Sequence, residues 1–242
     1  MKKFLIIGDS CLDEFVYCKS MRLAPDLPIP VLEIEKISSN PGMAMNVYRS
    51  VSHLSDSTEI ITNTDWQQQK KTRYVDSKTN HAFIRVDSIS PIDPLSNLPD
   101  LSTFEHIIIS DYNKGFLTEQ IITNILSGHK SVFLDTKKRL GSWAKNARYI
   151  KINDYEYKRS IEWLDKGLES KIIHTKGKDG CEFQGKDYPA EKVEVADTSG
   201  AGDAFMAALV TKFADCSDIV EAIEYANFMA SSVVQQKGVT GL

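Results

Sequence analysis

Short apolar runs recur along the chain, and each is followed by polar turn residues and then by a helical pattern. The runs occupy residues 4–7, 106–111, 131–135, 149–153 and 171–175. Continuous apolar runs that alternate with helices are typical of a parallel sheet buried on both faces. We therefore predict an α/β fold with a doubly wound, mostly parallel sheet and helices on both faces.

Every one of these runs ends in polar residues, namely Asp9, Asp111, Asp135, Asn153 and Thr175. Ligands of open α/β sheets bind at the carboxyl ends of the strands, so these side chains point to one shared crevice. The alternative is that each residue only caps the helix that follows it. Five such endings in sequence favour a site.

Two segments depart from this rhythm, because residues 28–38 and 71–88 alternate apolar and polar side chains. Such alternation predicts half-buried strands with one wet face. We interpret them as a small β-sheet lid on a single domain of residues 1–242. A lid of this kind covers a substrate or forms a dimer face. Because an exposed sheet needs a cover, we expect a homodimer through the lid.

The composition narrows the possible partners. With a net charge of −4 and no Lys/Arg stripe, the chain of 242 residues is a poor candidate for binding nucleic acid. No apolar stretch has membrane-spanning length, so no membrane partner is expected. The four cysteines form no CxxC pair and predict reduced thiols in a cytoplasmic protein. A small molecule remains as the expected partner.

The densest candidate chemistry is the run 197–203, DTSGAGD, which precedes a helical pattern. Gly200, Ala201 and Gly202 expose backbone amides at a helix N-terminus, an arrangement that suits a phosphoryl group. The carboxylate of Asp203 can accept the proton of an attacking sugar hydroxyl. The alternative is a turn whose aspartate only caps the helix.

Further motifs accompany this run in a fixed order. They are Gly8-Asp9, the segment 41–46, an NxxE at 153–156, a TxGxxG at 175–180 and Asn227. Together they resemble the ribokinase-like (PfkB) carbohydrate kinases over almost the whole chain. The narrower run from Arg22 to Val31 is similar to that of the kinase domain of ADP-heptose synthase, a heptose 7-phosphate kinase.

The resemblance implies ATP-dependent phosphorylation of a sugar or sugar-phosphate hydroxyl, with a heptose phosphate favoured. Asp203 would be the general base, and Gly200, Ala201 and Gly202 the anion hole. Asn153 and Glu156 would hold Mg²⁺ through water, and a monovalent cation would lie near Asp197 and Thr198. Acceptor binding is assigned to Asp9, Asp13, Gly42, Asn46, Arg85 and Lys114, and nucleotide binding to Asn153, Glu156, Thr175, Gly177, Gly180 and Asn227. Arg22 and Lys137 are further candidates for phosphate charges, unless they are solvated surface cations.

The chain also departs from the family pattern. Met43 stands where the family usually carries a second glycine, and the β-α-β unit between Asn46 and the lid is cut short. A trimmed, catalytically weak sugar- or nucleotide-binding module is therefore the alternative function. An NAD-type dehydrogenase is disfavoured, because the first run lacks a GxGxxG turn. No nucleotidyltransferase-like segment follows, so adenylyl transfer is not expected.

Overall fold

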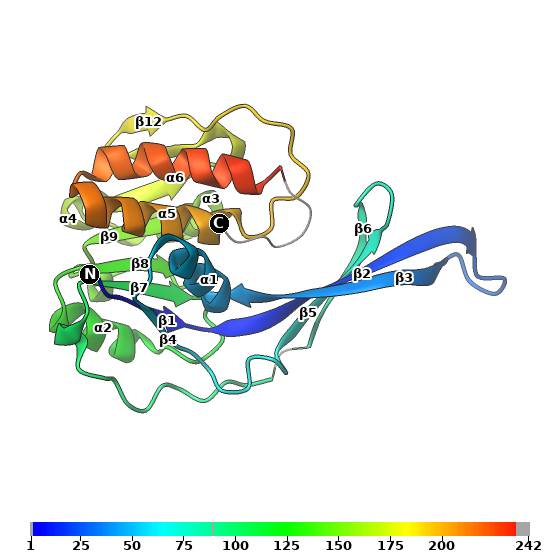
Figure 1. Cartoon of the computed structure of the whole chain (residues 1–242), viewed down its shortest axis with the longest axis horizontal. Helices are drawn as coiled ribbons and strands as arrows, with labels where there is room; N and C mark the ends of the chain where they lie inside the picture. Colours follow the sequence, from blue (N-terminus) through cyan, green and yellow to red (C-terminus); the bar gives the residue numbers. More distant parts are fainter. Residues whose placement is uncertain (1, 89, 236–242) are drawn as a thin grey trace.

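The computed structural model describes residues 2–88 and 90–235. The predicted domain of residues 1–242 thus includes positions 1, 89 and 236–242, which lie outside the described residues. Two sheets organise the chain, and Figure 1 shows that the second extends from one side of the first like an arm.

The body is built on an eight-stranded sheet with the order β12-β11-β10-β9-β8-β7-β1-β4. The strands from β4 to β10 in this order are parallel, and β11 and β12 continue the sheet as antiparallel edge strands. This arrangement confirms the predicted doubly wound, mostly parallel sheet. The strands are β1 (Phe4–Gly8), β4 (Thr58–Ile61), β7 (His106–Asp111), β8 (Val132–Thr136), β9 (Tyr149–Asn153), β10 (Ile172–Thr175), β11 (Cys181–Phe183) and β12 (Lys186–Tyr188).

Helices cover both faces of this sheet and enclose two apolar cores. Phe4 and Ile6 of β1 point into the core beneath α1 (Ala44–Leu54), α5 (Ala201–Cys216) and α6 (Ile219–Val233). Leu5 and Ile7 point into the opposite core. All four side chains are 2% exposed or less, and each stabilises the fold by about 1.5–3 kcal/mol. The opposite core also receives α2 (Glu119–Gly128), α3 (Asp154–Ser160), α4 (Lys166–Glu169) and the 3₁₀ turns Leu101–Thr103 and Ser142–Ala144. The 3₁₀ turn Ile161–Trp163 follows α3, with Ile161 and Trp163 exposed.

The second sheet, which we call the lid, has four strands in the order β3-β2-β5-β6. It comprises β2 (Ser10–Leu23), β3 (Pro30–Met43), β5 (Lys70–Asp76) and β6 (Ala82–Ser88). Strand β2 pairs antiparallel with β3 but parallel with β5. The sheet thus extends beyond the predicted segments 28–38 and 71–88. Strand β2 was not predicted from the sequence. It carries consecutive buried apolar residues at Phe15 and Val16, which obscure the alternation of apolar and polar positions.

The lid joins the body at the carboxyl edge of the main sheet. Only Asp9 separates β1 from β2, and β3 ends at Met43 immediately before α1. The Ala44 amide donates a 2.9 Å hydrogen bond to the Asp9 carbonyl oxygen, which ties the two junctions together. A Cβ atom on Gly8 would lie 1.9 Å from the Ser110 carbonyl oxygen, so only glycine permits this strand approach. The lid is therefore anchored beside the ends of the body strands.

The shortened segment after α1 leaves β4 at the edge of the body sheet. Residues 62–69 then lead directly into β5 of the lid. Among the described helices, none combines the length and apolar character needed to cross a membrane. The four cysteines are free thiols, and Cys11, Cys18 and Cys181 are buried.

Candidate active site

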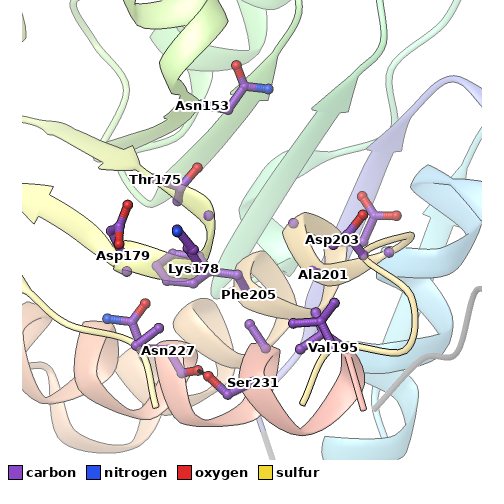
Figure 2. A pocket seen from close by; sticks show the side chains of 18 of the residues that line it. Asn153, Thr175, Lys178, Asp179, Val195, Ala201, Asp203, Phe205, Asn227 and Ser231 are labelled. Atoms are coloured by element: carbon purple, nitrogen blue, oxygen red, sulfur yellow. Dashed lines mark hydrogen bonds between the residues drawn. The ribbon is translucent and has the colours of Figure 1, made fainter. Parts of the chain in front are cut away.

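A pocket of about 660 Å³ opens where β9 and β10 end and α5 begins. Figure 2 shows Asp203 toward one end of it, with Asn227 and Ser231 projecting from α6 and Phe205 between them. The lining contributed by α6 mixes Ala230 with Asn227 and Ser231, and Lys137, Lys151 and Asp203 also line the pocket. The lining includes Tyr112, Lys137, Lys151, Asn153, Thr175, Gly177, Gly180, Val193, Val195, Thr198, Gly200–Asp203, Ala230 and Val234.

Asp203 is a buried carboxylate held by two side-chain donors. Its Oδ2 accepts a 2.9 Å hydrogen bond from Asn46 Nδ2, and its Oδ1 accepts a 2.7 Å bond from the Tyr112 hydroxyl. The carboxylate is 5% exposed. Burial raises the pKa of Asp203, while the bonds from Asn46 and Tyr112 oppose this rise because they favour the charged form. The result is a carboxylate fixed in orientation and poorly solvated.

The residues before Asp203 form a helix N-terminus, at which the Ala201 amide donates a 3.3 Å hydrogen bond to the Thr198 carbonyl oxygen. Gly200 caps α5 with φ of 85°, in the left-handed region, and no side chain caps the helix amides. The first turn of a helix has backbone N–H groups without intrahelical partners and carries the positive end of the dipole. A Cβ atom on Gly202 would lie 3.0 Å from Lys151 Nζ, so an ammonium group approaches this turn closely. The arrangement suits an anion.

Two lysines lie beside this turn in a network of ion pairs, Lys137 directly after β8 and Lys151 within β9. Lys151 Nζ lies 2.5 Å from Asp135 Oδ2, and both side chains are almost fully buried. Lys137 Nζ lies 2.5 Å from Glu156 Oε1 and 3.8 Å from Asp135 Oδ1. The ammonium of Lys137 thus stays charged between two carboxylates, beside the pocket. Both lysines line the pocket.

Asn153 and Glu156 form a capping box at the start of α3. Asn153 Oδ1 accepts from the Glu156 amide at 3.0 Å, and Glu156 Oε2 accepts from the Asn153 amide at 2.8 Å. Lys137 binds the other carboxylate oxygen. Across residues 2–88 and 90–235, no group of three or more His, Cys, Asp or Glu side chains is placed to hold a metal ion. Both carboxylate oxygens of Glu156 are already engaged by Asn153 and Lys137, so these two residues fit contact with Mg²⁺ through water better than direct coordination.

The predicted nucleotide residues lie around the opposite part of the pocket. Asn227 Nδ2 donates a 3.0 Å hydrogen bond to the Tyr188 carbonyl oxygen, which ties α6 to β12. Gly177 and Gly180 have φ of 61° and 85°, within the 3₁₀ turn Gly177–Asp179 and at its end. A Cβ atom on Gly180 would lie 2.1 Å from the Tyr188 carbonyl oxygen, whereas nothing lies within 4 Å of one on Gly177. Gly180 is thus needed for packing, and Gly177 leaves the pocket wall open.

The predicted acceptor residues gather where the lid meets the body. Asp9 is fully buried, and its carboxylate accepts from the Tyr112 amide at 2.7 Å and the Phe116 amide at 3.2 Å. Burial and the neighbouring Asp111 raise the pKa of Asp9. Asp13 belongs to β2 and pairs with Arg73 at 2.5 Å. Asp9 thus fixes the loop that carries Tyr112, in addition to its predicted part in acceptor binding.

Asn46 offers a free acceptor at this place. Its Nδ2 serves Asp203, but its buried Oδ1 has no hydrogen-bond partner among the described residues. A buried polar atom without a partner is rare, and a ligand hydroxyl would satisfy it. A Cβ atom on Gly42 would lie 2.0 Å from Asp13 Oδ2, so glycine is required for Asp13 to approach.

The second half of the chain matches a known protein family. The family model described as pfkB family carbohydrate kinase matches residues 105–242, more than half of the chain. The chain belongs to the pfkB family. This membership confirms the prediction of a carbohydrate kinase and excludes the dehydrogenase alternative.

The curated relatives are longer than this chain. It is 31% identical to the bifunctional protein HldE of Helicobacter pylori (strain J99) in an alignment of 296 residues. The alignment covers 98% of this chain and 64% of that relative. HldE of Caulobacter vibrioides is 27% identical, with 98% and 61% covered. The chain thus spans under two thirds of the length of these relatives.

Solved structures share the fold. Ribokinase from Thermotoga maritima superposes with a TM-score of 0.76 at 16% identity, covering 99% of this chain and 95% of that one. Ribokinase from Arabidopsis thaliana, solved with ribose and ATP, gives 0.71 at 14% identity, with 98% and 94% covered. These similarities confirm the ribokinase-like fold.

Three cations predicted to meet phosphates lie in different environments in this pfkB kinase. Arg85 is bound to Asp87 by two bonds of 2.7 Å on β6. Lys114 is partly buried in the loop after β7 and makes no ion pair with a described residue. Arg22 is exposed at the next-to-last position of β2, and it does not line the pocket. Lys137, in contrast, lines the pocket.

The predicted cation site remains a prediction. Asp197 Oδ1 accepts a 2.8 Å hydrogen bond from the Ser199 amide, and Thr198 lines the pocket. The roles of Tyr112 and Lys151 at this site, and the pairing of Lys151 with Asp135, were not predicted from the sequence. Lys151 does carry a recognisable signal, because it is a charged residue inside the otherwise apolar strand β9. A lysine buried in this way needs a partner.

Proposed function

We propose that this pfkB kinase transfers the γ-phosphoryl group of ATP to a hydroxyl of a sugar or sugar phosphate. The observation that carries the proposal is the position of Asp203, a buried carboxylate with fixed orientation in the first turn of an uncapped helix. Phosphoryl transfer depends mainly on positioning and on neutralising charge, and this turn offers both.

Asp203 would accept the proton of the attacking hydroxyl. Asn46 and Tyr112 hold its two oxygens, so the carboxylate needs no reorientation as the proton arrives. Burial raises the pKa of Asp203, which makes it a stronger base than an exposed aspartate. The free Oδ1 of Asn46 would accept from an acceptor hydroxyl nearby.

The amides of Gly200, Ala201 and Gly202 would receive the charge of the transferred phosphoryl group, with Lys151 beside them. The apolar residues along α6 and the 193–195 segment would accommodate the adenine ring, with Asn227, Thr175, Gly177 and Gly180 around the nucleotide. Asn153 and Glu156 would orient water around Mg²⁺, and Mg²⁺ would neutralise phosphate charge when bound. A monovalent cation near Asp197 and Thr198 belongs to the same proposal.

A heptose phosphate is the favoured acceptor, on the similarity to HldE and to the kinase domain of ADP-heptose synthase. ADP release from the purified chain should be measured with ATP, Mg²⁺ and a panel of hexoses, heptoses, pentoses and their phosphates. Turnover with a sugar phosphate and its loss in Asp203→Asn would support the proposal. No turnover with any sugar, or full activity in Asp203→Asn, would refute it.

The second candidate function is a binding module without turnover. The short segment between α1 and the lid and the presence of Met43 support it. Titration calorimetry separates the two candidates: a module binds ADP and a sugar with unchanged affinity in Asp203→Asn and releases no ADP from ATP.

We also propose a homodimer through the lid. The lid exposes large apolar side chains at Met21, Leu23, Ile34, Ile37, Ile84 and Val86. Exposed apolar clusters of this kind mark interaction surfaces. Sedimentation should show a dimer that Ile34→Glu weakens, while Lys130→Glu on the body surface leaves it intact. A monomeric wild-type chain at micromolar concentration would refute this proposal.

A further inference from the structure

The strand register places five charged side chains on one face of the lid. Asp13, Lys71 and Asp87 are direct neighbours across β2, β5 and β6, and Arg73 and Arg85 are opposite each other two residues further along. Residues opposite each other, and residues two apart, share one face of a sheet. These charges therefore form one continuous set.

Within this set the arginines and aspartates pair off. Arg73 binds Asp13 at 2.5 Å, and Arg85 binds Asp87 at 2.7 Å. Lys71 is left over: over residues 2–88 and 90–235, no carboxylate lies within ion-pair distance of its ammonium group. The set thus carries one uncompensated positive charge.

Lys71 is nevertheless buried. Lys71 is only 8% exposed. Its Nζ lies 2.9 Å from the Met43 Sδ and 5.0 Å from the centroid of the Tyr112 ring. A thioether and an aromatic face are weak partners for an ammonium ion. A buried charge without a counter-ion is costly, so a bound anion would stabilise it.

The position of Lys71 connects it to the reaction centre. The ring beneath its ammonium belongs to Tyr112, whose hydroxyl binds Asp203. Lys71 is also the register partner of Asp13, whose Oδ2 would lie 2.0 Å from a Cβ atom on Gly42. Lys71 therefore lies on the lid side of Asp203, among the residues predicted to bind the acceptor.

Met43, the departure from the family pattern, belongs to this arrangement. Its φ of 58° and ψ of −131° lie in a region that side chains other than glycine rarely adopt. The strain persists where the surroundings hold the residue, and Met43 is 2% exposed between the lid and α1. Its sulfur lies 2.9 Å from the Lys71 ammonium nitrogen.

We infer that Lys71 binds the anionic group of the acceptor and so selects a phosphorylated sugar over the free sugar. The inference rests on the proposed function, since it assigns a specificity residue to the acceptor side of the same site. The expected acceptor is a sugar phosphate. Its phosphate monoester would act as the counter-ion of Lys71.

The test compares Lys71→Met with Lys71→Arg and with Lys70→Met in the full chain. Lys70 is the adjacent strand residue, points to the other face of the lid and has a half-exposed side chain 3.7 Å from Glu14. Calorimetry would measure binding of heptose 7-phosphate, fructose 6-phosphate, ribose 5-phosphate, the three free sugars, and ADP. A charge-assisted contact predicts a loss of about 10- to 100-fold in sugar-phosphate affinity for Lys71→Met.

In the same variant the affinities for ADP and free sugars should stay unchanged, Lys71→Arg should recover most of the lost affinity, and Lys70→Met should match wild type. Equal losses for phosphorylated and free sugars, a loss of ADP affinity, or no sugar-phosphate binding by the wild-type chain would overturn the inference. Lys71-dependent binding without ADP release would instead refute the kinase proposal and leave the role of Lys71 in place.

Discussion

The Tyr112 hydroxyl donates a 2.7 Å hydrogen bond to Asp203, while the backbone amide of the same tyrosine donates at 2.7 Å to Asp9. Tyr112 thereby links the end of β1 to the first turn of α5. The ring between these contacts lies beneath two ammonium groups, those of Lys71 and Lys137, at 5.0 and 5.2 Å from its centroid. One residue thus connects the lid, the pocket and the proposed base.

Replacing Tyr112 with Phe should shift the pH dependence of the reaction. The lost hydrogen bond favours the charged form of Asp203, so its removal raises the pKa of Asp203 further. A bond to a charged group is worth about 1.5–3 kcal/mol, which corresponds to about one to two pH units. The acidic limb of kcat/KM should therefore move to higher pH by about this amount.

The measurement is a profile of kcat/KM between pH 5 and 9 for wild type and Tyr112→Phe, each with saturating ATP. A variant that is slower at every pH, with the limb in its wild-type position, would contradict a role in setting the pKa. Tyr17→Phe, on the lid, serves as the control tyrosine and should leave the limb unchanged.

Replacing Asp203 with Asn should slow turnover strongly and raise the free energy of unfolding. A folded-state pKa above the ordinary value means that the folded chain binds this proton more tightly, so its stabilising contribution is present at low pH and is lost as the pH rises through the raised pKa. Asn is neutral at every pH, and its amide can accept from Asn46 and donate to the Tyr112 oxygen. Activity should fall by about 10²–10⁴.

Thermal unfolding at pH 7.5 and at pH 5 would test the stability half of this prediction. The melting temperature of Asp203→Asn should exceed that of wild type at pH 7.5, with a smaller difference at pH 5. A lower melting temperature at both values would show that the carboxylate stabilises the fold.

Removing Lys151 should destabilise the chain through its partner. Burial alone would raise the pKa of Asp135, but the ammonium groups of Lys151 and Lys137 hold it below its ordinary value. Lys151→Met takes away the nearer cation at 2.5 Å, and breaking a buried pair from one side costs about 3–5 kcal/mol. Denaturant unfolding should show this loss, and the double variant with Asp135→Asn should recover part of it. A double variant less stable than Lys151→Met would contradict this account.

Two glycines of the nucleotide side offer a matched pair. Gly177 and Gly180 both have positive φ, so alanine is strained at either position. Only at Gly180 would the added Cβ also collide with a backbone oxygen, at 2.1 Å. Gly177→Ala should cost about 1 kcal/mol and Gly180→Ala clearly more in the free energy of unfolding. Equal losses would mean that the backbone near Tyr188 yields to the new methyl group.

Much of the body was predictable from its apolar runs. A strand such as β1 is apolar throughout because its alternate side chains enter two different cores, and such a pattern is read directly from the sequence. The run from Asp197 to Asp203 was recognisable because glycines and an aspartate together mark a helix start. The lid was harder, since β2 pairs with β5 in parallel across a long separation in the chain, which no local pattern reveals.

The partners of the site residues were hidden for the same reason. Tyr112 reaches Asp203 across ninety-one positions of the chain, and Asn46 across one hundred and fifty-seven. The sequence does not reveal that Lys71 lacks a carboxylate partner. This becomes visible only in the structure, where Arg73 and Arg85 pair with the neighbouring aspartates. The uncompensated positive charge results from the pairing of β2, β5 and β6, and no single segment of the sequence shows it.

The junction at Asp9 has a mechanical consequence. The residue joins β1 directly to β2, and its carboxylate also holds the loop of Tyr112. The first strand of the lid and the hydroxyl that orients Asp203 are therefore attached to the same residue. A displacement of β2 relative to β1 would thus shift the side chain that holds the proposed base in place.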